Sequence, residues 1–205
     1  SGMGLIAGPD LVAEVSGAGG LGIIAGLLLT ADQLRRAIRD VRAKTNKPFG
    51  VNLFIPADLR PPAPAAQVPD KTVQAVQAAL NPMRTTLGLP PTSARPSPPP
   101  DLIPDTLQVI LDERVPVFSV ALGNPGAEMV AECHRREIRI IAMGTTVADA
   151  RTVEATGLDA VVAQGGEAGG HRAHFEKPHS PDTGTVGALT LIPQVVDAVR
   201  IPVIA

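Results

Sequence analysis

Short apolar segments alternate with helical patterns along most of this chain, and this alternation restricts the fold to a few architectures. Each segment has four to seven residues and is bounded by turn residues, as buried parallel strands are. The expected strands are Leu21–Ala25, Gly50–Ile55, Val115–Ala121, Ile138–Ala142, Ala160–Ala163 and Pro202–Ala205. Because right-handed helical crossovers join parallel strands, these segments form either a βα barrel or an open doubly wound sheet. The pattern alone leaves both architectures open.

The helical patterns between these strands carry start and stop residues. Pro9 is suited to the first turn of a helix, and Gly19 and Gly20 are suited to its end. Thr30 and Gln33 have the spacing of a capping box at the start of a second helix. Further helices are expected at Ala127–Arg136, Val147–Thr156 and Pro193–Val199.

A proline-rich region interrupts the alternation. Thirteen of the 21 prolines lie between Pro56 and Pro104, around one helix-like segment, Lys71–Leu80. Proline has no backbone N–H to donate, so such runs favour extended, solvated conformations. We interpret residues 56–104 as a partly ordered insertion in a single domain that spans residues 1–205; a plain connecting loop is the competing interpretation.

The composition excludes several classes of function. A net charge of −2, a pI near 6.1 and the absence of Trp and Tyr do not indicate a surface that binds nucleic acid or an anionic membrane. A single cysteine excludes an intrachain disulfide and fits a reducing compartment. No signal-peptide pattern opens the sequence, and no apolar run approaches the length of a membrane span. We therefore expect a cytoplasmic protein.

The stretch Leu158–Phe175, LDAVVAQGGEAGGHRAHF, has the composition of a binding loop. A short buried strand ends at Gln164, and four glycines then frame one carboxylate, Glu167, and lead to one imidazole, His171. Glycines let a backbone approach a flat ligand closely, and an imidazole can transfer a proton near neutral pH. About 25 residues separate this strand from the next helical pattern, far more than an ordinary connection contains. A flexible surface loop with an incidental histidine is the competing interpretation.

This stretch also carries a family resemblance. The sequence VVAQGGEAGGHR is similar to the signature of the nitronate monooxygenase family, whose members were formerly called 2-nitropropane dioxygenases. Similar blocks follow the order of that family along almost the whole chain. They are SGMG at Ser1–Gly4, SGAGGLGIIAG at Ser16–Gly26, PFGVNLF at Pro48–Phe54, VPVFSVALGNP at Val115–Pro125 and LIPQVVDAVRIPVIA at Leu191–Ala205. The resemblance implies an FMN enzyme that oxidises alkyl nitronates with O₂ to a carbonyl compound and nitrite.

The resemblance favours the barrel over the doubly wound sheet. It implies an α/β protein with a (β/α)8 TIM-type barrel that is incomplete in this chain, because six strands are counted where eight are required. The first strand of the family would lie before Ser1 and the last one after Ala205. The backbone that holds the FMN phosphate would also follow Ala205, and the proline-rich insertion would lie over the barrel mouth.

The resemblance also implies roles for individual residues. Asn52, Gln164, Gly169 and Gly170 match positions that bind FMN, and Met3 and Gly4 match a segment beside the flavin. His171 matches the catalytic histidine. For Asn52 and Gln164, an amide that satisfies a strand end is the competing interpretation. The family usually has glycine after His-Arg, whereas this chain has Ala173.

The sequence patterns around the other candidate residues do not support further functional sites. Cys133 falls with Met129 and Val130 on one helix face, which predicts a buried, inert thiol. The GAGGLG sequence at Gly17–Gly22 precedes a strand, whereas a dinucleotide fingerprint follows one. No metal site is expected, because Glu167 and His171 make a pair of ligands at most. His174 and His179 are interpreted as exposed loop residues.

Two other functions remain as alternatives. A flavin-dependent enoyl-acyl-carrier-protein reductase would share the barrel and the EAGGH segment but would require NAD(P)H. A non-enzymatic protein, either an inactive truncated fragment or a binding module that uses the proline-rich region, is the third interpretation. The expected partners are a small nitronate and O₂, with no nucleic acid or membrane, and a homodimer is one candidate assembly.

Overall fold

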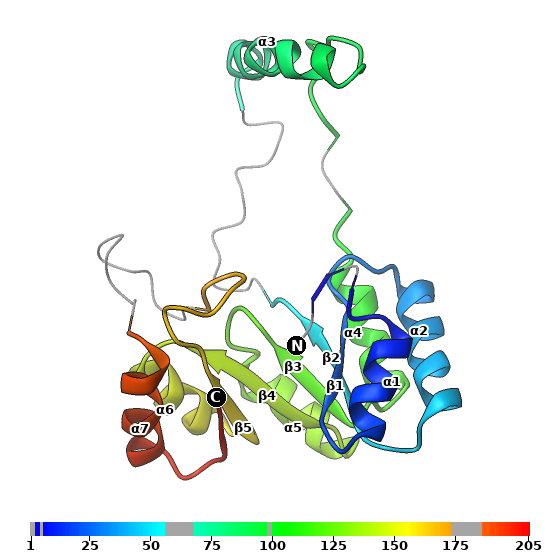
Figure 1. Ribbon diagram of the computed structural model, residues 1–205. Coiled ribbons are helices and arrows are strands. Elements are labelled where there is room, and N and C mark those ends of the chain that lie inside the picture. The colour runs from blue at the N-terminus through cyan, green and yellow to red at the C-terminus, as the bar shows by residue number, and fades with distance from the viewer. Residues whose placement is uncertain (1–2, 5, 56–67, 98–99, 174–185) are drawn as a thin grey trace. The chain divides into compact units, whose positions relative to one another are not determined.

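The structure is a computed structural model that describes residues 3–4, 6–55, 68–97, 100–173 and 186–205. It divides into two compact units, one made of residues 1–59 with 102–205 and one of residues 60–101 (Figure 1). No helix within the described ranges combines the length and the apolar character needed to cross a membrane.

The larger unit is built on a sheet of six parallel strands. The strands are β1 (Gly22–Ala25), β2 (Phe49–Leu53), β3 (Val117–Val120), β4 (Arg139–Gly144), β5 (Ala160–Ala163) and β6 (Val203–Ile204). Their order in the sheet is β1-β2-β3-β4-β5-β6, the same as their order in the chain. A doubly wound sheet would reverse its strand order at a switch point, whereas a barrel adds each strand beside the last. The structure therefore confirms a TIM-type barrel, of which the described residues form six strands.

Helices cover one face of this sheet (Figure 1). They are α1 (Pro9–Gly17), α2 (Ala31–Lys44), α4 (Ile103–Asp112), α5 (Gly126–Arg135), α6 (Val147–Thr156) and α7 (Ala188–Ala198). Strand side chains alternate between the two faces, and those beneath the helices form the hydrophobic core. Ile24, Val51, Phe118 and Ile140 lie in register across β1–β4, and each is at most 1% exposed. The opposite face carries the polar residues of the candidate site.

The start of α2 confirms the predicted capping box. The Thr30 hydroxyl accepts a hydrogen bond from the Gln33 N–H at 3.3 Å, and the Gln33 side-chain oxygen accepts one from the Thr30 N–H at 2.8 Å. Leu34 and Ile38 then face the core and are fully buried. The hydrogen bonds of the capping box and the apolar stripe at helical spacing thus both favour a helix at α2.

Two helices of the larger unit differ from the sequence prediction because of proline. The prediction started α7 at Pro193, but the helix begins at Ala188 and Pro193 lies inside it. The prediction omitted α4, because Pro104 was grouped with the proline-rich region. Pro104 instead occupies the first turn of α4, where a missing N–H costs nothing.

The smaller unit consists of α3 (Asp70–Thr86) and the segment that returns along it. The helix is longer than the predicted Lys71–Leu80 because it continues through Pro82. The Asn81 side chain donates to Thr92 O at 3.2 Å and accepts from Thr92 N at 2.9 Å, and Gln77 Nε2 donates to Ala94 O at 2.9 Å. That the region is an insertion of a single domain over the barrel mouth stays a prediction.

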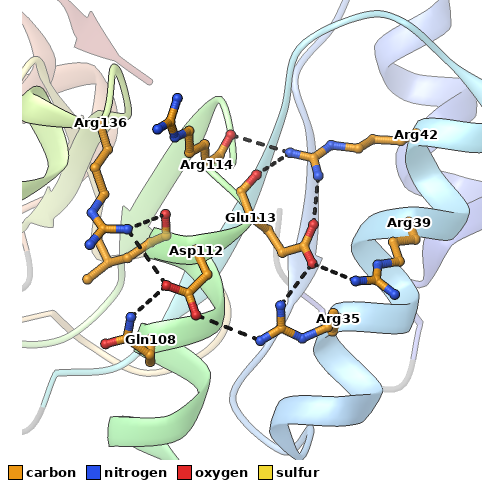
Figure 2. Close-up of polar contacts among 9 residues, drawn as sticks. Arg35, Arg39, Arg42, Gln108, Asp112, Glu113, Arg114 and Arg136 are labelled. Carbon is orange, nitrogen blue, oxygen red and sulfur yellow. Dashed lines mark hydrogen bonds and ion pairs between the residues drawn. The ribbon is translucent and has the colours of Figure 1, made fainter.

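One carboxylate joins three arginines of α2 to the end of α4 (Figure 2). Arg35, Arg39 and Arg42 lie on one face of α2, and each forms an ion pair with Glu113 at 3.0, 3.3 and 2.9 Å. The Glu113 side chain is only 11% exposed. This cluster closes the α2–α4 contact on the outside of the barrel, away from the strand ends that form the candidate site.

Candidate functional site

A cleft of about 930 Å³ opens beside the carboxyl ends of β1 and β2. Most residues that the sequence selected line it: Met3, Gly4, Asn52, Gly169, Gly170 and His171. The rest of the wall is largely apolar and includes Ile24, Leu28 and Phe54. The carboxyl ends of the strands carry the active sites of βα barrels, and the volume suits a cofactor-sized ligand.

A second cavity, of about 530 Å³, lies on the inner face of the sheet. It shares Asn52, Phe54 and the segment Gly169–His171 with the cleft, and it adds Ser119 and Gln164. The seven residues assigned to the site by resemblance therefore lie around two cavities with a common wall. Of these seven residues, Gln164 is the one that lines the inner cavity and does not line the cleft.

Asn52 is held in one orientation by its neighbour in the sheet. It lies in register with Ser119 on β3, and its Nδ2 donates to the Ser119 carbonyl and hydroxyl oxygens, each at 3.1 Å. These bonds identify Nδ2 and leave Oδ1, within the described residues, as the acceptor that faces no protein donor. A ligand N–H can use this oxygen.

The Gln164 side chain binds the backbone at the end of the glycine-rich loop that follows β5. Its side chain is 5% exposed; Nε2 donates to His171 O at 2.9 Å, and Oε1 accepts from Ala173 N at 3.0 Å. Both ends of the amide thus hold the backbone on either side of Arg172. The methyl group of Ala173, where the family usually has glycine, is fully buried beneath the loop.

Arg172 is directed back to the end of β5. Its Nη1 donates to Gly165 O at 2.7 Å and to Gln164 O at 3.2 Å. These carbonyls follow the last residue of the strand, so the guanidinium ties the end of the loop to its beginning. The described hydrogen bonds of Arg172 are therefore those of a residue that anchors the loop.

Glu167 joins the loop to the start of α7, a role that the sequence did not reveal. Its carboxylate oxygens accept from Ala188 N at 2.9 and 3.0 Å, and Gly166 N donates to Val186 O at 2.7 Å. Hydrogen bonds from its own N–H and from Ala188 N–H, together with the charge of Arg172, keep the pKa of Glu167 below its usual value, although desolvation opposes this shift. The residue before α7, Gly187, has no side chain to cap the helix, so Glu167 supplies this function from a distance.

His171 presents its ring to both cavities. The side chain is exposed, and its ring forms a T-shaped pair with the ring of Phe54, with centroids 5.2 Å apart and planes inclined by 68°. Because Gln164 holds the backbone carbonyl of His171, the position of the residue does not depend on contacts of its imidazole. This arrangement leaves ring nitrogens able to reach a ligand and exchange a proton with it.

The remaining candidates lie outside the cleft. Cys133 is fully buried on α5, and burial raises the pKa of its thiol to about 11, which confirms the inert residue that was predicted. Gly17–Gly22 connects α1 to β1. It therefore precedes a strand, whereas a dinucleotide-binding fingerprint would follow one. Within the described ranges, no three His, Cys, Asp or Glu side chains gather at metal-binding distances. His174 and His179 fall in 174–185, outside the described residues.

Six sequentially wound parallel strands with a cleft at their carboxyl ends define the class of proteins with a TIM-barrel fold. Comparison with known proteins resolves this class further. The chain belongs to the nitronate monooxygenase family, whose family model matches residues 1–205.

Relatives and solved structures agree with this membership. The chain is 34% identical over 197 residues to a probable nitronate monooxygenase of Staphylococcus saprophyticus and 37% identical over 196 residues to that of Staphylococcus haemolyticus. Each match covers 96% of this chain and 53% of the relative, so the chain spans about half the length of these proteins. Nitroalkane oxidase from Streptomyces ansochromogenes superposes with a TM-score of 0.81 at 34% identity, over 99% of this chain and 56% of that one. FabK from Thermotoga maritima superposes with a TM-score of 0.66 at 30% identity, over 99% and 48%.

We expect Glu167→Gln to destabilise the intact protein at neutral pH and to have a smaller effect at an acidic pH below the usual pKa of glutamate, because the stabilising charge is lost as the pH falls through the lowered pKa. A carboxylate whose pKa is lowered in the fold stabilises the protein above its usual value of 4.5, and this contribution is lost as the pH falls through the lowered pKa. Glutamine keeps the shape but has no charge to lose. The measurement is the difference in Tm between wild type and variant across this pH range.

Glu14→Gln on α1 provides the control. Glu14 is exposed, and the structure describes no hydrogen bond to its carboxylate. The difference in Tm between Glu14→Gln and wild type should stay close to zero at both pH values. A deficit for Glu167→Gln that is equal at both pH values would show that its charge does not anchor α7.

Proposed function

We propose that this protein uses FMN to oxidise alkyl nitronates with O₂, giving a carbonyl compound and nitrite. One observation carries the proposal: six of the seven residues assigned to the flavin site by sequence come together around a single cleft, with His171 at its wall. Family membership and the similarity to a nitroalkane oxidase support the same chemistry. A cytoplasmic location, expected from composition, belongs to the proposal.

The residues present fit a flavin. An isoalloxazine ring has a flat surface and an edge of carbonyl and N–H groups, so it needs open backbone on one side and amide partners on another. A Cβ placed on Gly169 or Gly170 would meet no atom within 4 Å, which leaves the loop surface open. Gly170 also has a φ of +86°, a conformation that favours glycine. The Oδ1 atom of Asn52 supplies an acceptor on the strand side of the cleft.

The chain's own residues would bind and orient the reactants. When bound, FMN supplies the redox chemistry that couples nitronate oxidation to the reduction of O₂. The imidazole of His171 would donate a hydrogen bond to a nitronate oxygen or hold a proton beside it, because it is an exposed donor at the cleft. Asn52 would fix the cofactor edge, while Gln164 and Arg172 keep the loop in place through their backbone contacts.

The choice of reductant tests the proposal against the enoyl-acyl-carrier-protein reductase alternative. A nitronate oxidase takes electrons from its substrate, so an alkyl nitronate added without oxygen should reduce or perturb the flavin of the intact protein. NADH and NADPH should leave it oxidised for minutes. The measurement is stopped-flow absorbance in the flavin band with each reductant in turn, followed in air by oxygen consumption and nitrite release.

Each result has a clear meaning for the assignment. Flavin bleaching by NADH in the absence of nitronate would transfer the assignment to the reductase. A purified intact protein that takes up no flavin would favour the non-enzymatic interpretation instead.

A further inference from the structure

The exposed face of α3 carries an apolar stripe with the spacing of a coiled coil. Val73, Val76, Leu80, Met83 and Leu87 follow one another at intervals of three and four residues. Such intervals place side chains on one face of a helix, in the pattern by which two helices pack together. Val76, Leu80, Met83 and Leu87 are 54%, 44%, 64% and 68% exposed, although a soluble helix normally buries such a stripe.

A cavity beside this stripe is lined by residues with the spacing of a coiled-coil hole. Its volume is about 390 Å³, and its wall includes Val73, Val76, Gln77 and Leu80. These residues stand at i, i+3, i+4 and i+7, the four positions that form the hole for a knob in coiled-coil packing. The return segment adds Arg95 and Pro96 to the lining of this cavity.

The charges beside the stripe determine the direction of the partner. Asp70 lies near the start of α3 and Arg84 near its end, both on the same flank of the stripe. An antiparallel copy of α3 that aligns the apolar layers places Asp70 of each copy next to the partner subunit's Arg84. A parallel copy would place each of them beside uncharged residues, Thr72, Ala79 and Thr86. The Asp70 side chain is 84% exposed, so its ion pair with Arg95 leaves it accessible.

We propose that α3 is a self-association element, which pairs antiparallel with α3 of a second copy of this chain. Leu80 of each copy enters the hole of the other, the apolar stripe is removed from water, and two ion pairs join Asp70 to the partner subunit's Arg84. The pairing is isologous, because the same residues contribute on both sides. A helix of 17 residues is about 26 Å long, which is short for a coiled coil, so the dimer is expected to form reversibly.

Sedimentation equilibrium of the intact protein tests the pairing. Wild type should dimerise reversibly, and Leu80→Glu should raise the dissociation constant by about 100-fold or more, because it places an unpaired charge in the seam. Ala78→Glu is the matched control, since it adds the same charge on the opposite face of α3 and should change the constant by less than about threefold. A monomeric wild type, or equal effects of the two variants, would overturn the proposal.

A charge exchange tests the direction and does not depend on Leu80. Asp70→Arg and Arg84→Asp each place two like-charged pairs in the symmetric dimer, so each variant alone should dimerise about tenfold more weakly. An equal mixture should form a heterodimer tighter than either variant alone, because each copy then carries the charge complementary to the other. A mixture that associates no better than the separate variants would exclude the antiparallel arrangement. Far-UV circular dichroism of each variant should retain the wild-type helix content.

Discussion

Replacing His171 by alanine should lower the turnover of an alkyl nitronate by about 10²–10⁴-fold, the usual contribution of a positioned acid or base. The flavin spectrum and the Tm of the intact protein should remain at their wild-type values. The reason is that the described contact of the ring is the edge of Phe54, while Gln164 holds the backbone at His171. Steady-state nitrite release, together with flavin absorbance and thermal unfolding, separates the two effects.

His134→Ala is the matched control for this experiment. His134 lies on α5, where its Nε2 is 3.0 Å from Asp159 Oδ2. The same substitution there should lower stability and leave turnover unchanged. If His171→Ala releases flavin or lowers Tm along with turnover, then His171 is a structural residue of the loop.

Gly165→Ala should destabilise the protein by about 1–3 kcal/mol, the typical cost of excess volume in a packed site. A Cβ at this position would lie 2.6 Å from Ala188 N and 2.7 Å from Ala188 Cβ. The new methyl group would therefore push the loop away from α7 and disturb the contact that Glu167 makes there. Chemical denaturation of the intact protein measures the loss, and flavin retention should decrease with it.

Gly169→Ala is the opposite case in the same loop. A Cβ there meets no atom within 4 Å, so we expect stability within about 0.5 kcal/mol of wild type. Flavin affinity should nevertheless fall by at least tenfold, because the methyl group would occupy the space proposed for the ring. Unchanged flavin affinity in Gly169→Ala would show that the cofactor does not approach this part of the loop.

The strands were the most predictable elements of the fold. Segments such as Ala160–Ala163 are apolar, short and bounded by turn residues, and their burial on the sheet follows directly from that composition. The parallel alternation restricted the topology to two architectures, and the sequential strand order then selected the barrel. Proline was the main source of error. The sequence predicts that α7 starts at Pro193, which lies inside the helix, and it places Pro104 in the proline-rich region, although this residue lies in the first turn of α4.

The site was predictable in its members but not in its internal contacts. Asn52 was identified because it matches a flavin-binding position of the resembled family, and His171 because it also ends a glycine-rich loop that follows a buried strand. The contact from Glu167 to Ala188 spans 21 residues of sequence, and no local pattern indicates it. The direction of Arg172 could not be predicted either, since a long side chain beside a glycine loop can turn to the ligand or to the backbone.

The common wall of the two cavities has a consequence for how ligands would influence one another. Asn52, Phe54 and His171 border both the cleft and the inner cavity. Two molecules that occupy these spaces would contact the same side chains. By thermodynamic linkage, any change that one imposes on this wall alters the affinity for the other, and the factor is the same in both directions. The order in which two ligands enter such a site therefore does not change the free energy of the fully occupied state.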